Sequence, residues 1–272
     1  MAVKYGDLLS IQGWDDFPIY QARWMQHQMK KQKSNFKDFY GFLEPPDPEF
    51  DEHPDPDAYQ LKKVFFFNPM NDPRFSISHG SSGIKCQNGH LLRVIGPRQK
   101  APRPVIGLCD MWYVQGVDVQ CTNKCQTSHF STISQEFLSL LSPPLRSRLP
   151  CRITKAKMVS KEVALLVDSA SDPGTSNWGQ LAAKIKEGHK NAFMERALQY
   201  AAHVDFFKND NATVSGAFST TAQKSFREVQ PFKPAETIHE QTLRLNYQDR
   251  CSPSFFYSST LQHTHTYMCN NI

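Results

Sequence analysis

The spacing of apolar residues changes character along the chain. Residues 64–67 (Val-Phe-Phe-Phe) form a short apolar run that Pro69 closes, and residues 91–95 and 104–119 alternate apolar and polar side chains. Short apolar runs and alternation are typical of β-strands. From residue 134 onward the apolar positions recur every three to four residues, which is the period of an α-helix. The pattern therefore predicts paired strands followed by helices.

The predicted helices have recognisable ends. Ser134, Ser160 and Thr175 each precede a helical segment, and a Ser or Thr side chain at this position accepts a hydrogen bond from a backbone N–H of the first turn. A Pro-Pro pair ends the first helix, and Gly188 lies at a junction within the last segment. We predict three or four short helices after the strands.

A shift in composition marks a linker. Residues 44–58 hold seven acidic side chains and no Lys or Arg, and they are rich in proline, which favours an extended, solvated chain. Upstream, residues 19–33 carry a weak helical pattern that includes Trp24. The predicted organisation is a partly ordered N-terminal segment (1–43), an acidic Pro-rich linker (44–60), a folded domain (61–208) and a largely disordered tail (209–272).

Charge and cysteine content narrow the class of protein. The net charge is +5, and leaving out the seven acids of residues 44–58 raises it to +12, so the rest of the chain is strongly basic. The count of seven cysteines is odd, and the chain begins without the apolar segment of a secretory signal. No apolar run approaches the length of a membrane span. We therefore expect an intracellular protein with no membrane partner, and a short basic cluster at residues 30–33 favours the nucleus over the cytoplasm.

Two short motifs carry the candidate chemistry. Cys86-Gln-Asn-Gly-His90 and Cys121-Thr-Asn-Lys-Cys125 each place two metal-binding side chains four positions apart, with turn-forming residues between them. The intervening segment is long enough for two strands that bring the motifs together. The sequence predicts that Cys86, His90, Cys121 and Cys125 bind one structural Zn²⁺ ion.

Other interpretations of these residues stay open. His129 follows Cys125 by four positions and can replace His90 as a ligand. The cysteines can also be reduced thiols in an apolar core, although buried thiols need no turn formers beside them. Cys109 lies in an apolar run without a nearby partner, and we expect it to belong to the core.

Basic residues lie between the two motifs. Residues 85–103 contain Lys85, Arg93, Arg98, Lys100 and Arg103 and no acid. Cations on a metal-held hairpin are suited to contact phosphates, although a solvated hairpin tip without a partner has the same composition.

A second basic run follows between the first two predicted helices. It leads into a helix, whose N-terminus adds partial positive charge, and ordinary surface charge is the alternative interpretation. With two such runs the sequence favours nucleic-acid binding, with DNA over RNA. The candidate contacts in this run are Arg146, Arg148, Arg152, Lys155 and Lys157.

Signs of catalysis are weak. Two-metal nuclease chemistry needs several carboxylates that converge on a sheet, whereas Asp110, Asp118, Asp168 and Asp172 are scattered. His189 follows a glycine near the helix junction, where we expect it to cap a helix or to hydrogen-bond a carbonyl. The sequence therefore predicts a protein that is not an enzyme.

The order of these features resembles an uncharacterised eukaryotic domain-of-unknown-function family that occurs in mobile-element, transposase-like proteins. The resemblance runs from about residue 65 to 203. It implies a zinc-ribbon-like module followed by helices, often upstream of a transposase-like nuclease region. Relatives have Cys-x-x-Cys in each half, whereas this chain has Cys-x₃-His and Cys-x₃-Cys. The landmarks are Phe66-Phe67-x-Pro69, the Cys86 and Cys121/Cys125 motifs, Val105-Ile106 to Trp112-Tyr113, Ser134 to Leu141, Leu149-Pro150-x-x-Ile153-Thr154, Glu187-x-His189 and Arg196-Ala-Leu-Gln-Tyr200.

These observations combine into one prediction. The fold is α+β, with a zinc-ribbon-like β-hairpin module followed by three or four short helices and with flexible N- and C-terminal segments. The function is non-catalytic, zinc-stabilised nucleic-acid binding, in a chain derived from a mobile element. The alternatives are a protein-interaction module, whose contacts lie in the aromatic strands, the N-terminal segment or the acidic linker, and a truncated element without function.

Overall fold

The computed structural model describes most of the chain before residue 213. The described residues are 17–31, 39–48, 55–72, 83–98, 100–123, 125, 129–153, 158–169 and 178–212. Lys155, Lys157, Thr175 and nearly all of the predicted tail lie outside them, so the predictions for those residues stay predictions. The domain boundaries also stay predictions.

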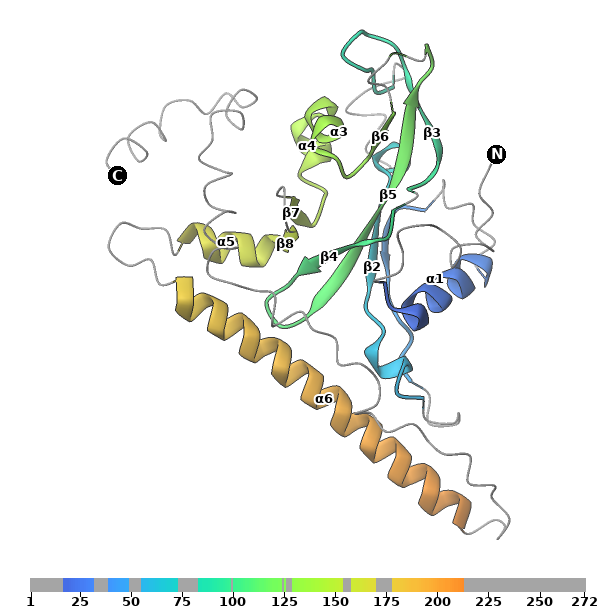
Figure 1. The fold of residues 1–272 in the computed structure, drawn as a ribbon, viewed down its shortest axis with the longest axis vertical. Helices are drawn as coiled ribbons and strands as arrows, with labels where there is room; N and C mark the ends of the chain where they lie inside the picture. Colours follow the sequence, from blue (N-terminus) through green and yellow to red (C-terminus); the bar gives the residue numbers. More distant parts are fainter. Residues whose placement is uncertain are drawn as a thin grey trace. The chain divides into compact units, whose positions relative to one another are not determined.

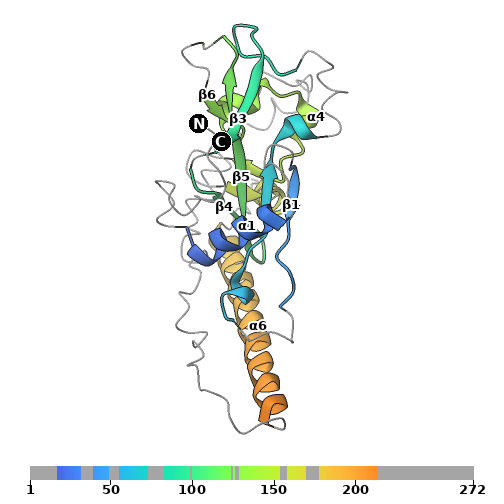
Figure 2. The same ribbon diagram turned by 90° about the vertical axis from the view of Figure 1, so that its right-hand side faces the viewer.

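The described chain contains both helices and strands, and the four strands β3 to β6 follow one another directly (Figures 1 and 2). The helices are α1 (Ile19–Lys31), α3 (Gln135–Leu140), α4 (Pro143–Arg146), α5 (Lys161–Ser169) and α6 (Trp178–Ala212), with 3₁₀ turns at Ala58–Gln60 and Pro69–Asn71. The strands are β1 (Gly41–Leu43), β2 (Val64–Phe67), β3 (Leu92–Pro97), β4 (Arg103–Ile106), β5 (Met111–Cys121), β6 (His129–Ser131), β7 (Cys151–Ile153) and β8 (Met158–Ser160).

The strands form one mixed sheet of eight strands. Its order is β1-β2-β5-β4-β8-β7, and β3 and β6 pair with β5 off this path. Strand β2 runs parallel to β5, with Val64 opposite Tyr113, whereas β3 and β6 run antiparallel to it. The long strand β5 pairs with β2 through its first half and with β3 and β6 through its second half. Strand β2, expected from the apolar run, is confirmed.

The predicted fold class is wrong. A zinc-ribbon-like hairpin followed by a few short helices is not what the chain forms, because the strands around the two motifs belong to the eight-stranded sheet. The alternation of residues 104–119 covers two strands rather than one. Between β4 and β5 the chain turns at residues 107–110, where the Gly107 N–H donates to the Asp110 carbonyl at 2.9 Å. Alternation reports which side chains are buried, and it does not report where the chain reverses.

The expectation that all helices are short is wrong too. Helix α6 has 35 residues and continues through Gly188. A Cβ atom at position 188 would lie 2.9 Å from the Leu108 carbonyl oxygen. The glycine therefore permits a close approach between the helix and the residue 107–110 turn, and it does not end the helix.

The chain divides into two compact units. The described part of the first unit comprises residues up to 104, residues 112–150 and residues 194–212, and that of the second comprises residues 105–111 and the described residues between 151 and 193. The first unit contains both candidate metal-binding motifs. Its core includes Phe66, Phe67, Val114, Val119 and Phe137, each at most 1% exposed.

Two contacts hold the segment before β2 within the first unit. The Gln21 amide of α1 donates to the Lys62 carbonyl at 2.7 Å and accepts from the Lys62 backbone N–H at 2.8 Å. The Tyr59 hydroxyl hydrogen-bonds Nδ1 of His203 in α6, and both side chains are buried. Residues 59–62 are thus fastened to both a preceding and a distant helix.

The second unit has its own apolar core. Seven buried residues from β4, β8, α5 and the first half of α6 pack together: Ile106, Val159, Val163, Ala164, Val167, Trp178 and Ile185. Within this unit Nε2 of His189 lies 2.9 Å from the Gly107 carbonyl oxygen, so the predicted hydrogen bond of His189 to a carbonyl is confirmed. Cys109, expected in the core, is exposed instead, because it lies at the turn between the two strands.

Two of the predicted helix caps are confirmed. The Ser134 hydroxyl accepts from the Phe137 N–H at 3.2 Å at the start of α3, and the Ser160 hydroxyl accepts from the Val163 N–H at 3.3 Å at the start of α5. None of the helices in the described residues has both the length and the apolar character that a membrane-spanning helix requires.

Candidate metal centre

The first motif is a tight hydrogen-bonded turn. The Cys86 N–H donates to the His90 carbonyl at 2.8 Å, and the Gly89 N–H donates to the Cys86 carbonyl at 2.9 Å. Gly89 has a φ of +79°, a conformation that glycine adopts far more readily than residues with a Cβ atom. This turn brings the side chains of Cys86 and His90 to the same side of the backbone.

Strand pairing brings the second motif to the first. In the β3–β5 ladder Leu92 lies opposite Cys121, so the end of the first motif meets the start of the second. The Leu92 N–H donates to the Ile84 carbonyl, and the Thr122 N–H donates to the Leu91 carbonyl, both at 2.9 Å. Local turns and a long-range register together position the site.

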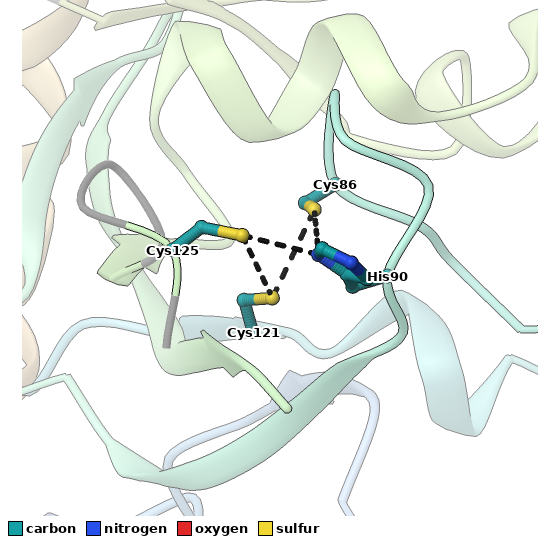
Figure 3. A group of neighbouring side chains, drawn as sticks. All are labelled: Cys86, His90, Cys121 and Cys125. Carbon is teal, nitrogen blue, oxygen red and sulfur yellow. Dashed lines mark hydrogen bonds between the residues drawn. The ribbon is translucent and has the colours of Figure 1, made fainter. Parts of the chain in front are cut away.

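Four side chains converge at this point, as Figure 3 shows. The ligand atoms of Cys86, His90, Cys121 and Cys125 all lie within 4.8 Å of one another. Two of the sulfurs, those of Cys86 and Cys121, are buried. The structure therefore places all four predicted ligands in one group that can hold a metal ion.

The distances between these atoms fit a tetrahedral ion. Zn–S bonds of about 2.3 Å and Zn–N bonds of about 2.0 Å at tetrahedral angles separate two sulfurs by about 3.8 Å and a sulfur from a nitrogen by about 3.5 Å. Sγ of Cys121 lies 3.8 Å from Sγ of Cys86 and 3.6 Å from Sγ of Cys125. Nδ1 of His90 lies 3.9 Å and 3.1 Å from the sulfurs of Cys86 and Cys125. The sulfurs are too far apart for a disulfide.

The thiols differ in how readily they ionise. Burial raises the pKa of Cys121, but hydrogen bonds from the Cys125 and Asn123 backbone outweigh burial, and the pKa falls to about 7. At Cys125 the Asn88 side chain lowers the pKa, whereas burial and the neighbouring thiols raise it, and the net shift is upward. A thiolate at Cys121 is the form that binds a metal.

The structure describes the side chain of one candidate histidine, His90, whereas the side chain of the other, His129, lies outside the described part of the chain. His90 belongs to the converging group, and Nδ1 is the ring nitrogen that faces the three sulfurs. The backbone of His129 lies in β6 opposite Gln120. The motif spacing alone determined neither the histidine nor its nitrogen, because both depend on how the strands pair.

The basic residues near the centre fall into two groups. Arg93 and Lys100 are exposed, as is Lys85 beside the first motif. Arg98 is partly buried, and its guanidinium donates to the Ala101 carbonyl at 3.0 Å. Burial and then the charge of Arg103 lower the pKa of Arg98.

Three arginines of the second basic run make contacts within the protein. Arg148 forms an ion pair of 2.7 Å with the buried Asp72, and Arg152 forms a two-bonded pair with Asp168 at 3.0 and 3.2 Å. Arg146 donates to the Leu141 carbonyl at 3.1 Å. These three contacts favour a structural role for the arginines, and their predicted contact with nucleic acid stays a prediction.

Two exposed apolar residues next to the centre were not predicted from the sequence. Leu91 and Ile95 are 46% and 38% exposed on either side of Arg93, whereas Leu92 between them is buried. Alternation was the available signal, since it places residues 91, 93 and 95 on one face of the strand.

Comparison with known proteins gives a family without an assigned role. Residues 15–240 match the family described as "Domain of unknown function (DUF6729)", and since this match spans most of the chain, the chain belongs to that family. No curated protein and no solved structure matches it.

Proposed function

We propose that this chain is a non-catalytic nucleic-acid-binding protein whose binding face is held by a structural Zn²⁺ ion. The observation that carries the proposal is the convergence of Cys86, His90, Cys121 and Cys125 at tetrahedral distances. Three sulfurs and one imidazole nitrogen are a donor set that zinc prefers. Four protein ligands leave no open position for a substrate, which is typical of structural and not of catalytic zinc sites.

The cations around the centre support a nucleic-acid partner. Lys85 and Arg93 are exposed beside the two motifs, and Lys100 is exposed in the loop that follows β3. A metal ion bound by both motifs would keep such cations in fixed relative positions, which suits the regular spacing of phosphates. We extend the proposal to DNA rather than RNA on the basis of the two basic runs, and to a nuclear location on the basis of the basic cluster at residues 30–33. Descent from a mobile element is proposed on the basis of the sequence resemblance.

Metal analysis is the first test. The purified chain is expected to contain one equivalent of zinc, and Cys121→Ser is expected to contain none. Cys109→Ser is the matched control, because Cys109 is exposed and lies outside the converging group. A folded wild-type protein without zinc, even after reconstitution with Zn²⁺, would refute the metal centre.

Salt-dependent binding is the second test. Affinity for duplex DNA should fall steeply as salt is raised, because released counterions drive binding through phosphates. Arg93→Ala and Lys100→Ala should each reduce the salt slope by about one unit per lost phosphate contact. Lys186→Ala changes another exposed cation, in α6, and should leave the slope unchanged. DNA binding that is absent at low salt would contradict the nucleic-acid part of the proposal and leave the metal centre intact.

One observation supports a second candidate, a protein-interaction module. The exposed Leu91 and Ile95 lie two residues before and after Arg93 and add apolar area near it. Single exposed aliphatic residues are common on protein surfaces, so this candidate ranks second. It predicts a partner whose binding is insensitive to salt and is lost in Leu91→Ser and Ile95→Ser.

A further inference from the structure

Buried side chains alternate with more accessible ones along three adjoining segments near the metal centre, residues 84–86, 91–93 and 120–122. The buried side chains are those of Ile84, Cys86, Leu92 and Cys121. The exposed or half-buried ones are Lys85, Leu91, Arg93, Gln120 and Thr122. Successive side chains of an extended chain point to opposite faces, so these five share the face away from the buried cysteines. We call them the outer face.

Backbone pairing makes the residues of the outer face neighbours. Lys85 pairs with Leu91 across the first motif. Arg93 lies opposite Gln120 in the ladder between β3 and β5, which run side by side in Figure 1. The Thr122 N–H donates to the Leu91 carbonyl at 2.9 Å. Directly opposite residues on one face lie about 5 Å apart, so the outer face is one continuous surface.

The outer face has a defined end. The register between β3 and β5 shifts between Val94 and Gly96, which marks a β-bulge. Asp118, opposite Gly96, lies beyond this bulge and is half-buried. The outer face itself contains two cations and no acid, so its charge is complementary to a polyanion.

The outer face also carries uncharged groups. Beside the two cations lie the amide of Gln120, the hydroxyl of Thr122 and the aliphatic side chain of Leu91, which is 46% exposed. Contacts to phosphates position a protein on DNA without reading its sequence, whereas amides, hydroxyls and apolar groups read the edges of bases. The composition of the face therefore offers both kinds of contact.

We propose that the outer face lies in the major groove of duplex DNA, where Gln120 hydrogen-bonds an adenine and where Leu91 and Thr122 contact thymine methyl groups. A Gln side chain accepts from N6 of adenine and donates to N7 in a two-bonded contact. The inference rests on the proposed function, in which Lys85 and Arg93 contact phosphates, and it adds base recognition.

The spacing of these side chains determines the kind of site. Leu91 and Thr122 lie within about 8 Å of Gln120 on the same face. Base pairs repeat about every 3.4 Å along the duplex, so these side chains reach one base pair and its close neighbours. Strands in other DNA-binding proteins present their side chains to a groove in this way. The expected target is a short run of A·T pairs.

The metal centre lies on the other side of the same segments. Cys86 and Cys121 alternate with the residues of the outer face, and their sulfurs belong to the converging group. A bound ion would therefore fix the spacing of the segments from behind. Base recognition depends on such fixed spacing, because hydrogen bonds to base edges are directional.

Selection from a duplex library with a randomised centre tests the proposal, with the full chain reconstituted with Zn²⁺. The wild type should enrich duplexes that contain a short run of A·T pairs. Gln120→Ala should lower its preference for these duplexes, over duplexes with G·C in their place, by about tenfold, as expected for one lost two-bonded contact. Gln199→Ala is the matched control, because it changes an exposed glutamine of α6.

Gln120→Glu distinguishes lost recognition from lost folding. A carboxylate accepts from N4 of cytosine and cannot donate to N7 of adenine, so this variant should select C·G in place of one A·T pair. A misfolded protein would not acquire a new preference. Lys85→Ala should instead weaken binding to all duplexes alike and lower the salt slope by about one.

The outcomes separate this inference from the function on which it rests. Equal affinity for all duplexes, or equal effects of Gln120→Ala and Gln199→Ala on preference, would overturn base recognition and leave the proposed DNA binding intact. Absence of duplex binding at low salt would overturn both and would favour a protein partner for the outer face.

Discussion

The Cys86–His90 turn of the first unit and the apolar core of the second unit are stabilised in different ways. In the turn, Gln87, Asn88 and Gly89 are exposed, and the backbone is held by hydrogen bonds beside the converging side chains. In the second unit seven apolar residues exclude water from one another. Burial stabilises a core in proportion to the apolar area removed from water. A short polar turn buries little such area, so its stability would depend on the bonds that its side chains form to a metal ion. Loss of metal and loss of packing should therefore damage separate parts of the chain.

Metal removal should have the largest effect on stability, and this effect should be confined to the first unit. Structural zinc contributes roughly 10–16 kcal/mol in small zinc-folded peptides, so a strong chelator should open residues 84–92 and the end of β5. Hydrogen exchange should show lost protection there and retained protection in α5. Added Zn²⁺ should reverse the change, whereas Mg²⁺ should not. Equal loss in α5 would show that the two regions unfold together.

A cavity in the core of the second unit should destabilise that unit and leave the metal centre unchanged. Ile185 is fully buried, and Ile185→Ala should lower the free energy of unfolding by about 2–5 kcal/mol, measured by urea denaturation. Leu165→Ala removes a largely exposed side chain and should change it by no more than about 0.5 kcal/mol. The zinc content of Ile185→Ala should stay at the wild-type value. Loss of zinc in this variant would contradict separate stabilisation.

An added methyl group at Gly188 should also destabilise the second unit. Alanine is favoured over glycine in a helix by about 1 kcal/mol, yet its Cβ would lie 2.9 Å from the Leu108 carbonyl oxygen. We expect Gly188→Ala to cost about 1–3 kcal/mol net, because backbone must move to relieve the contact. Asn191→Ala, at an exposed position of the same helix, should stabilise slightly. A more stable Gly188→Ala protein would show that the helix and the turn do not pack this closely.

The smallest expected effects on stability come from substitutions at the two helix caps. Ser134→Ala and Ser160→Ala each remove one side-chain acceptor from a helix N-terminus, and each should cost about 1 kcal/mol. Ser134→Thr and Ser160→Thr retain the hydroxyl and serve as controls. Thermal unfolding measures both pairs. A much larger cost at Ser160, which is 3% exposed, would show that its burial adds to the cap.

Local chemistry was predictable from the sequence. The caps at Ser134 and Ser160 follow from residue type and position, and the convergence of Cys86, His90, Cys121 and Cys125 was anticipated from turn residues and spacing. Pairings between distant strands were not predictable. Strand β2 joins β5 in parallel, and parallel neighbours leave no short hairpin signal in the sequence.

The sequence by itself determined which residues are suited to bind a metal, because ligand chemistry and tight turns are local properties of the chain. Tertiary structure decided that Leu92 faces Cys121, which completes the ligand group, and that Gly188 serves a close contact and does not break a helix. It also decided which side of α6 is buried, and so left Met194 and Leu198 exposed. An apolar residue is favoured in any dry environment, and only the packed fold specifies whether its own chain provides one.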